Sequence, residues 1–499
     1  MGACLSKKGK LQKQTSRLND NLVQDDNRKV TDVYTTTKEL GKGQASNIVQ
    51  VRGKNYVKST HGNFAMKLYD GKAKFPPDLK TEAEILKRCN HPNIIRLFEL
   101  AKTGKKNKQL SLVMELCTGG SVLDRMPYKD EKQVVKILHQ LISAVCYLHQ
   151  QQHVAHRDIE PSNILYETED EDSDIKLIDF GCATLLEPTE RGGYKFLTEK
   201  TGTLHIMAPE VLKGKYSPQA DMWSVGVVAY TLFQDGKKPF DGPTIEKVEQ
   251  QISMASLNYP SWHRSKEAKA FVKQLLCKDP RARLTASKAL HHPFMAQGRP
   301  KIKLSNELVV SFQMYARGSP LKRIALNALV LKSAVTVRKE YRQLFRNLDM
   351  DQKGSLTKLE FKTGFKNSGF SDEELEDLFT KLDVNNNKEI MYTEFLAATL
   401  EVSGELEEAQ IKEAFEILDE DASGAISKKN LIKLLGGEAE DQKAAEIMLE
   451  GQNEMKYEEF AQLFEQNFSF RGMDTIQEMS LTAEQLSFER TKAGDDGGW

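Results

Sequence analysis

The stretch that decides the fold of this 499-residue chain is His156-Arg157-Asp158-Ile159-Glu160-Pro161-Ser162-Asn163. Taken alone, it is compatible with a surface turn in which a short helix begins at Pro161, because proline favours the first helical position. A second stretch follows it, Ile175-Lys176-Leu177-Ile178-Asp179-Phe180-Gly181, which is typical of a strand that ends in a polar turn. The two stretches together make the isolated surface turn the less favoured interpretation.

The octapeptide resembles the catalytic loop of protein kinases, H-R-D-L-x-x-x-N, and the second stretch resembles their D-F-G motif. The resemblance implies that Asp158 accepts the proton of the attacking hydroxyl group. It also implies that the amide oxygen of Asn163 and the carboxylate of Asp179 hold magnesium. Phosphoryl transfer depends on positioning and charge neutralisation, and these side chains are the candidate centre for it.

Three upstream patterns agree with this resemblance. Residues Leu40–Ile48 are similar to the glycine-rich kinase loop, with Ser46 in place of the third glycine; a hairpin turn is the alternative for this loop alone, and the patterns that follow favour the kinase loop. Phe64-Ala65-Met66-Lys67 resembles the strand whose lysine holds the α- and β-phosphates, and Glu82 stands where the family places the partner of that lysine. Glu115-Leu116-Cys117 resembles the hinge that binds adenine. The residues that the resemblance assigns to ATP binding are Gly41, Lys42, Gly43, Ser46, Ile48, Ala65, Lys67, Glu115 and Cys117.

Downstream patterns complete the resemblance. Ala208-Pro209-Glu210 is similar to the end of a kinase activation segment, and Arg283 stands where the family pairs an arginine with this glutamate. Asp221–Gly226 resembles the helix that braces the catalytic loop. In this order and spacing, residues 34–294 predict a bilobal protein kinase domain. Its candidate catalytic residues are Lys67, Glu82, Asp158, Asn163 and Asp179.

Glu160 departs from the kinase pattern, which normally has a lysine at this position in contact with the γ-phosphate. Reversal of this charge predicts slow but measurable phosphotransfer. The glutamate escapes much of the repulsion if it turns to solvent or pairs with a neighbouring cation.

Three further positions bear on substrate choice and activation. Ser121 and Ser162 stand where kinases for basic substrates often carry acids, which leaves Asp124 as a remaining acid. Glu199 resembles the fixed acid of kinases that need no phosphorylation of the activation segment, with Arg157 as its partner.

The N-terminal tail, residues 1–33, carries three membrane signals. Met1–Ser6 matches the N-myristoylation pattern M-G-x-x-x-[ST], with Gly2 as the acceptor. Cys4 offers a thiol for palmitoylation, and five basic residues follow before the first acid at Asp20. Because one acyl chain anchors only weakly, the combination predicts a cytoplasmic protein held at a membrane. A basic tail that is never acylated is the alternative.

The bulk composition excludes several classes of protein. The 71 lysines and arginines balance 71 acids, so there is no general attraction to nucleic acid. The six cysteines form no C-x-x-C pair, which argues against zinc sites and a disulfide framework. No uncharged apolar run approaches the ~18 residues that span a bilayer.

Residues 295–336 predict a regulatory junction. From Ser305 to Val337 apolar residues recur at helical spacing, and Lys322 and Arg323 add basic character. This pattern is typical of a basic amphipathic helix that a calcium sensor binds, although a plain packing helix is the alternative. The repeats that follow favour the regulatory interpretation.

Residues 337–470 contain four degenerate helix–loop–helix repeats with a period of roughly 35 residues. An EF-hand loop has oxygen ligands at alternate positions, glycine at its sixth position and glutamate at its twelfth. Lys353 takes an oxygen position in the first loop, Lys388 the glycine position in the second, and Asn430 the glutamate position in the third. The fourth unit keeps only its exit, Tyr457–Phe460. The candidate calcium ligands are Asp349, Asp351, Ser355 and Glu360 in the first loop, Asp383, Asn385, Asn387, Glu389 and Glu394 in the second, and Asp419, Asp421 and Ser423 in the third.

We therefore predict at most three bound calcium ions, with weak affinity, and none in the fourth unit. Paired hands that pack without metal are the alternative interpretation of these losses.

The combination of a lipid-anchored kinase, a basic junction and four EF-hand units resembles the calcium-dependent protein kinases of plants and protists. The resemblance covers residues 2 to about 470 and leaves residues 471–499 as a C-terminal tail. The predicted fold class is α+β multidomain, a bilobal kinase fold followed by an all-α, calmodulin-like EF-hand domain. By this resemblance the junction occupies the substrate cleft without calcium, and calcium opens the helix pairs so that they bind the junction instead.

Two hypotheses of different classes remain open from the sequence. One is a monomeric, calcium-regulated serine/threonine kinase that uses ATP, Mg²⁺ and Ca²⁺ and transfers the γ-phosphate to protein hydroxyls. The other is a catalytically weak pseudokinase that acts as a membrane-anchored calcium sensor or scaffold. The presence of all five candidate catalytic residues favours the first hypothesis.

Overall fold

The computed structural model describes only part of the chain. The described residues are 25–29, 33–42, 46–53, 62–69, 79–103, 109–190, 192–255, 257, 262–298, 306–332, 339–351, 353–366, 368, 370–385, 387–400, 406–435 and 439–464. The chain forms two compact units, one built mainly of Val23–Pro300 and the other mainly of Lys301–Leu348 and Ser355–Trp499.

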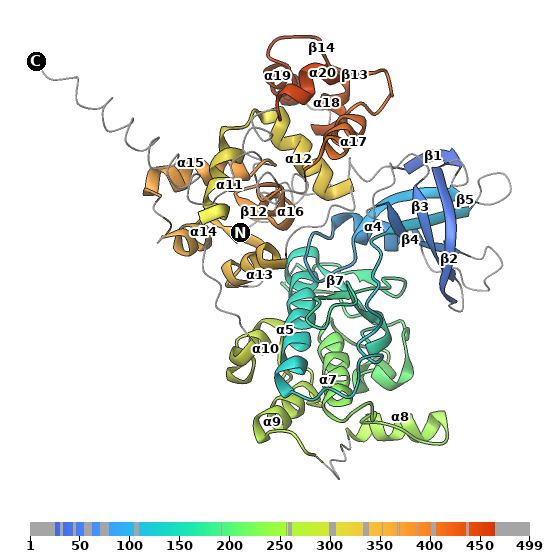
Figure 1. Cartoon of the computed structure of the whole chain (residues 1–499). Coiled ribbons are helices and arrows are strands. Elements are labelled where there is room, and N and C mark those ends of the chain that lie inside the picture. Colours follow the sequence, from blue (N-terminus) through green and yellow to red (C-terminus); the bar gives the residue numbers. More distant parts are fainter. Residues whose placement is uncertain are drawn as a thin grey trace, which may run out of the picture. The chain divides into compact units, whose positions relative to one another are not determined.

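The first unit begins with a six-stranded sheet (Figure 1). Its strands lie in the order β1, β5, β6, β4, β3, β2, with the bounds Asp25–Lys29, Leu97–Thr103, Gln109–Met114, Asn63–Tyr69, Ser46–Gly53 and Tyr34–Lys42. Strand β1 pairs in parallel with β5, whereas the other described neighbours are antiparallel. β1 falls within the segment that the sequence assigns to the basic tail, and its polar residues carry no strand pattern.

Helix α4 (Leu79–Arg88) packs beside β5 and carries the catalytic candidate Glu82. Glu82, Ala83, Ile85 and Leu86 are buried, a spacing that places them on one face of the helix. Burying an unpaired carboxylate lowers the stability of the fold. Glu82 on this face therefore needs a cation from the sheet as its partner.

The helical lobe is organised around α5 (Glu131–Tyr147) and α7 (Gln219–Phe233), which pack against each other at its centre (Figure 1). Nearly every residue of α7 is buried, as expected for a helix that is apolar on all sides. The other helices are α6 (Pro209–Leu212), α8 (Ile245–Met254), α9 (Lys266–Leu275), α10 (Ala286–Leu290), η1 (Leu148–Gln152), η3 (Leu204–Ile206) and η4 (Pro293–Gly298).

Four short strands and one short helix lie within or beside the two catalytic stretches. They are β7 (Val154–Ala155), η2 (Pro161–Asn163), β8 (Ile164–Tyr166), β9 (Ile175–Leu177) and β10 (Thr184–Leu185). Strand β7 pairs with β10, and β8 pairs with β9. The octapeptide connects β7 to β8 and the D-F-G stretch connects β9 to β10, so both run between the same two strand pairs.

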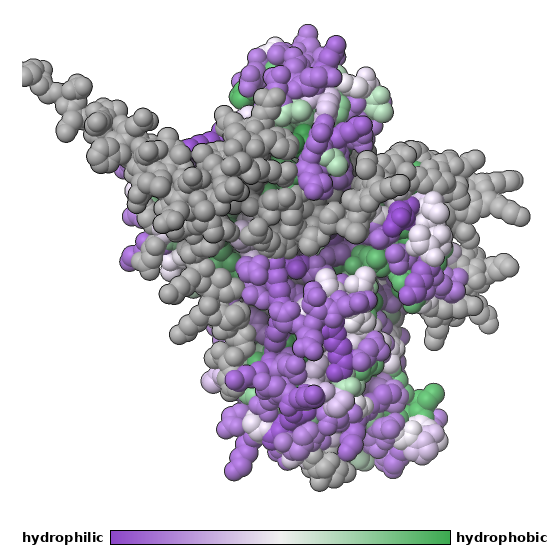
Figure 2. All heavy atoms as spheres, in the orientation of Figure 1, coloured by the Kyte–Doolittle hydropathy of each residue, from purple (hydrophilic) through white to green (hydrophobic). Residues whose placement is uncertain are grey.

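The surface visible in Figure 2 is largely polar over the helical lobe. Exposed large apolar side chains include Ile245 and Met254, the first and last residues of α8. Among the described helices none is long and apolar enough to cross a bilayer.

The second unit consists of paired helix–loop–helix hands, which confirms the predicted fold class. The first pair has α13 (Lys339–Leu348), α14 (Lys358–Phe365), α15 (Asp372–Leu382) and α16 (Tyr392–Ala397), and its loops are joined by β11 (Ser355–Thr357) and β12 (Glu389–Met391). The second pair has α17 (Glu408–Leu418), α18 (Lys428–Leu435), α19 (Ala439–Met448) and α20 (Tyr457–Gln462), joined by β13 (Ala425–Ser427) and β14 (Glu454–Lys456).

The predicted single junction helix is wrong, because the structure has two helices, α11 (Asn306–Arg317) and α12 (Pro320–Lys332). Pro320 lacks a backbone N–H and cannot continue α11, but it suits the first turn of a new helix. Arg323 reinforces the break, since its guanidinium donates to the Gly318 carbonyl oxygen at 2.7 Å.

Both junction helices contribute to the core of the EF-hand unit. The ring of Phe312 on α11 packs 5.3 Å from those of Phe365 and Phe395, and Ser311 Oγ donates to the Ala398 carbonyl oxygen at 2.6 Å. Helix α12 packs against α16 and α17 and buries almost all of its apolar side chains. The hands of the second unit therefore already hold the segment that the sequence predicts as their target.

Candidate active site and calcium loops

The catalytic stretch is held by Asp221 on α7. Its buried carboxylate accepts the backbone N–H groups of His156 at 2.9 Å and Arg157 at 2.8 Å, and it contacts His149 Nε2 at 2.8 Å. Burial alone raises the pKa of Asp221, but the contact with His149 and the other donors outweigh burial and lower it. The ionised carboxylate thus fixes the loop backbone, including Arg157, which has a φ of 68°.

Asp158 lies half-buried with both carboxylate oxygens oriented. Oδ1 accepts the Thr203 N–H at 2.9 Å, and Oδ2 lies 3.3 Å from Asn163 Nδ2. Gly202 permits the close approach of the Thr203 segment, because a Cβ at this glycine would lie 2.3 Å from the Arg157 carbonyl oxygen. The side chain in the position of the predicted base is therefore fixed from two directions.

Lys67 joins the sheet lobe to the D-F-G stretch. Its Nζ lies 2.9 Å from Glu82 Oε1 and 2.8 Å from Asp179 Oδ1, and Tyr69 Oη also donates to Glu82. Burial would lower the pKa of Lys67, but the two carboxylates outweigh it and raise the pKa well above its ordinary value. Lys67 is therefore a permanent cation that connects strand β4, helix α4 and Asp179.

One oxygen of Asn163 and one of Asp179 accept no hydrogen bond among the described residues, and both suit a magnesium ion. Asn163 donates its amide nitrogen to the Asp158 carbonyl oxygen at 3.0 Å, and its amide oxygen accepts no hydrogen bond among the described residues. Asp179 uses Oδ1 for Lys67 and for the Gly181 N–H at 3.1 Å, whereas Oδ2 accepts no hydrogen bond in the described part of the chain. Carboxylate and amide oxygens are suitable ligands for this hard cation.

The predicted ATP-binding residues lie on the strands that face the hinge. Gly41 pairs with Ile48, Ser46 pairs with Tyr69, and Ala65 pairs with Met114, the residue before the hinge. For Lys42 the structure describes only the backbone, and Gly43 lies outside the described residues.

The hinge retains backbone groups for a ligand. Glu115 carries an ion pair, with Oε1 2.9 Å from Lys176 Nζ, and it is tied to Arg96 by a backbone hydrogen bond of 2.9 Å. The N–H and C=O of Cys117 make no hydrogen bond within the described residues. Because adenine pairs with such backbone groups, the hinge has the chemistry that the sequence predicts for it.

The activation segment contains the predicted pair of Arg157 and Glu199, with Nη1 and Oε2 3.0 Å apart. Tyr216 Oη donates to the Glu199 carbonyl oxygen at 2.6 Å, which holds the same residue from its other side. At the end of the segment, Arg283 binds Glu210 through two nitrogens at 2.6 and 3.0 Å. These contacts fix the described part of the segment at Glu199 and at Glu210.

Glu160 neither turns freely into solvent nor pairs with a cation. Its half-buried carboxylate accepts the hydroxyl group of Ser162, and no lysine or arginine nitrogen lies within 4.0 Å of it among the described residues. Asp124 accepts the Ser121 N–H and hydroxyl group, each at 2.7 Å, and these bonds lower the pKa of Asp124. The two serines thus each engage an acid.

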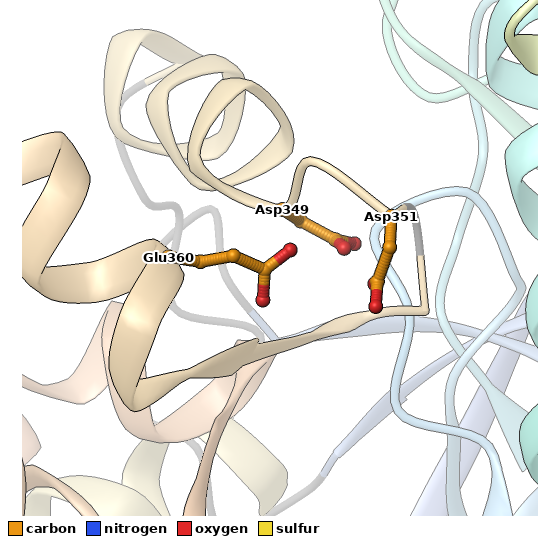
Figure 3. Close-up of side chains that lie close together, drawn as sticks. All are labelled: Asp349, Asp351 and Glu360. Atoms are coloured by element: carbon orange, nitrogen blue, oxygen red, sulfur yellow. The ribbon is translucent and has the colours of Figure 1, made fainter.

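The first calcium loop brings Asp349, Asp351 and Glu360 together, with one ligand oxygen from each within 4.8 Å of the others (Figure 3). Lys353 lies in the same loop, where its ammonium group pairs with Asp351. Glu360 Oε2 also accepts the Thr357 N–H at 2.9 Å. The fourth predicted ligand, Ser355, donates its hydroxyl group to Glu389 at 2.6 Å, so it serves the strand pair between the loops.

The second loop holds its candidate ligands Asp383 and Asn385 in place through backbone donors. Asp383 accepts the N–H groups of Asn387 at 2.9 Å and Lys388 at 2.8 Å, and Asn385 Oδ1 accepts the Asn387 N–H at 3.0 Å. Lys388 adopts the left-handed φ of 72° that glycine provides at little cost. Burial and the neighbouring Asp383 raise the pKa of Glu394 to about 8.

Glu394 also shows why the second loop suits a cation. Its carboxyl group accepts the N–H groups of Asn385 at 3.1 Å and Met391 at 2.8 Å. No lysine or arginine nitrogen lies within 4.0 Å of it in the described residues. A divalent cation would supply the charge that this buried acid lacks.

The third loop is ordered but has a weaker ligand set. Asp419 accepts the Ser423 N–H and hydroxyl group, each at 3.0 Å, and the Gly424 N–H at 2.7 Å. Hydrogen bonds from Ser423 and Asn430 lower the pKa of Asp421, which stays ionised. Asn430 offers one amide oxygen, already used to cap the Ser427 N–H at 2.8 Å, where a loop normally has a bidentate glutamate.

The fourth unit has no complete loop. Only residues 449–453 separate α19 from β14, and they form a turn with positive φ at Glu450 and Gly451. The remaining strand β14 supports the third loop by pairing with β13.

Sequence comparison identifies two families in the chain. Residues 34–295 match the protein kinase domain family, and residues 338–400 match the EF-hand domain pair. The chain is 33% identical to calcium-dependent protein kinase 3 of Plasmodium berghei over 375 residues, covering 73% of this chain and 66% of the relative. It is 30% identical to calcium-dependent protein kinase 22 of Arabidopsis thaliana over 417 residues, covering 80% of this chain and 82% of the relative. The chain belongs to the calcium-dependent protein kinases.

As a member of this family the chain is a calcium-regulated serine/threonine protein kinase, and neither the comparisons nor the geometry favour the pseudokinase hypothesis. Family resemblance alone did not reveal two contacts of this kinase. Tyr69 has no motif around it, and its bond to Glu82 depends on strand β4 facing α4. The Thr203 N–H that orients Asp158 is a backbone donor, so no residue pattern signals it.

Proposed function

We propose that this kinase transfers the γ-phosphate of ATP to protein hydroxyl groups with Asp158 as the base. The substrate oxygen forms a bond to the γ-phosphorus, the bond from phosphorus to the β–γ bridging oxygen breaks, and the hydroxyl proton passes to Asp158. Lys67 positions the α- and β-phosphates, while Asn163 and Asp179 would hold magnesium, which neutralises charge on the phosphates. The hinge backbone at Cys117 would receive adenine.

The observation that carries this proposal is the double contact of Lys67. At 2.9 Å from Glu82 and 2.8 Å from Asp179, one cation connects both lobes' catalytic residues while Asp158 is oriented by the Thr203 N–H. Phosphoryl transfer requires these groups to be in place together, because it depends on positioning and charge.

The test is phosphotransfer from labelled ATP to a general protein substrate by the purified full chain. Asp158→Asn should lower kcat by at least ~100-fold, because it removes the base and retains the shape of the side chain. Glu169→Gln, at an exposed residue of the β8–β9 hairpin, is the matched control and should leave kcat unchanged. Equal rates for Asp158→Asn and the unmodified chain would refute the assignment.

Calcium control rests on the second and third loops, in our proposal. The second loop presents five oxygen-bearing positions and a buried acid, Glu394, whose pKa is raised to about 8 by burial and by the neighbouring Asp383. Asp383→Asn together with Glu394→Gln should remove one calcium ion from the full chain, as measured by isothermal titration. A calcium stoichiometry that does not change would contradict this assignment.

In this proposal, calcium controls whether the EF-hand unit holds the junction, helices α11 and α12. Its apolar side chains are covered within the EF-hand unit, and Phe312 is fully buried among three aromatic rings of α14 and α16. This packing supports a mechanism in which the calcium-loaded hands retain the junction and leave the substrate cleft open. Phe312→Asp should lower activity in calcium to the level found with chelator, because the hands can no longer bury this face.

Membrane anchoring through the N-terminal tail completes the proposal. Gly2, Cys4 and the basic residues lie outside the described residues, so the support is the sequence alone. We place this monomeric kinase in the cytoplasm, at the surface of a membrane. Cell fractionation tests this, and a soluble unmodified chain would contradict it.

A further inference from the structure

We propose that the ammonium group of Lys353 is an internal cation that occupies the first EF-hand loop in place of calcium. The inference deepens the calcium control proposed above, because it states which loop does not sense the ion. It concerns the cluster of Asp349, Asp351 and Glu360 in Figure 3.

The charge of the cluster is the first step of the argument. Three carboxylates that bring oxygens within 4.8 Å of one another repel each other unless a cation lies near them. Lys353 provides that cation, since its ammonium group pairs with Asp351. A calcium ion entering this loop would meet a positive charge already present.

The number of ligands is the second step. Lys353 takes the fifth position of the loop, so the side-chain oxygen that calcium needs there is missing. The backbone of the same residue is also engaged, because its N–H donates to Asp349 Oδ1 at 2.9 Å while the Gly354 N–H donates to Oδ2 at 2.8 Å. The second loop has the same backbone bonds to Asp383, so the feature that sets the first loop apart is the ammonium group of Lys353, which pairs with Asp351.

The state of Glu360 is the third step. Its Oε2 accepts the N–H and the hydroxyl group of Thr357, at 2.9 and 2.6 Å, which makes it part of the capping box of α14. In the second loop Glu394 accepts the Met391 N–H at 2.8 Å in the same way, so the cap does not distinguish the loops and Lys353 does. In the second loop Lys388 is exposed and lies at the sixth position, so the two lysines are not equivalent.

The experiment counts calcium ions bound to the full chain by native mass spectrometry, with calcium chloride as the probe. Glu360→Gln should leave the count of the unmodified chain unchanged, since the first loop holds none, and glutamine keeps the capping box. Lys353→Asn should add one ion, and Glu360→Gln in that background should remove it again. Lys388→Asn is the matched control and should not add an ion.

A second readout avoids calcium altogether. With chelator present, Lys353→Met should speed amide hydrogen exchange at Gly354 and Ser355 by at least tenfold, because the loop loses its cation, whereas Lys388→Met should not. Loss of an ion from the unmodified chain with Glu360→Gln, no gain with Lys353→Asn, or unchanged exchange with Lys353→Met would overturn the inference. Failure of the proposed calcium control is distinguishable, because it appears as a chain that binds no calcium in any loop.

Discussion

Removing the negative charge of Glu160 should accelerate phosphotransfer. Two unit charges about 4 Å apart interact by roughly 4 kcal/mol at an effective dielectric of 20, and by about half of this at twice the distance. We take the smaller value, ~2 kcal/mol, for the repulsion between the Glu160 carboxylate and the phosphate in transfer. The reason is that the carboxylate is held at the Ser162 hydroxyl group and not by a cation. At about 1.4 kcal/mol per factor of ten, Glu160→Gln should raise kcat on the order of 30-fold, and Glu160→Lys several hundred-fold.

Replacing Ser162 tests the same repulsion in the opposite direction, because it should lower kcat. Ser162→Ala removes the only hydrogen bond to the Glu160 carboxylate among the described residues, and the carboxylate then approaches the phosphates more often. The loss of a half-exposed hydrogen bond of ~1 kcal/mol should lower kcat by about fivefold. In the Glu160→Gln background the same serine change should have little effect, because the repelling charge is already gone.

Steady-state kinetics with varied ATP measure these effects. The gain should appear in kcat more than in KM for ATP, since the charge acts on the phosphate in transfer and leaves the hinge unchanged. Equal or lower kcat in both Glu160 variants would show that the site is rebuilt around the glutamate, and the reasoning would be wrong.

Three other predictions concern the catalytic frame and the tail. Lys67→Met should abolish phosphotransfer and cost about 3–5 kcal/mol of folding free energy, because it leaves Glu82 buried with no cation among the described residues; thermal unfolding measures the cost. Asp221→Asn should destabilise the chain at pH 7, and a pH series of melting curves should show this loss shrinking below about pH 4. The lowered pKa of Asp221 sets that sign, because stability gained from an ionised acid is lost as the folded form becomes protonated. Gly2→Ala should release the kinase from membranes in fractionation, whereas Cys4→Ser should leave a salt-sensitive remnant.

The catalytic frame could be predicted from sequence because each of its parts lies in a short, ordered pattern. Lys67, Asp158 and Asp179 are each embedded in a motif, and the structure brings Lys67 and Asp179 within 2.8 Å although they are far apart in the chain. The sequence showed Ser162 only as a serine where related kinases often have an acid. The spacing of residues could not show that its hydroxyl group donates to Glu160. That contact depends on the tight turn of η2, which brings the two side chains together.

The junction shows where helical periodicity misleads. Apolar residues continue at helical spacing through Gly318, Ser319 and Pro320, but a proline ends the helix before it whatever the pattern of its neighbours. Those three residues were a readable stop signal. Strand β1, in contrast, could not be found, since its residues Asp25–Lys29 are all polar and the pairing comes from the free edge of β5.

The most direct test of calcium regulation is the rate of phosphotransfer by the 499-residue chain in calcium and in chelator, with ATP and magnesium held constant. The account predicts a rate at least severalfold higher in calcium, an effect that disappears when Asp383 and Glu394 of the second loop are replaced together by Asn and Gln. Equal rates in calcium and chelator for the unmodified chain would contradict it.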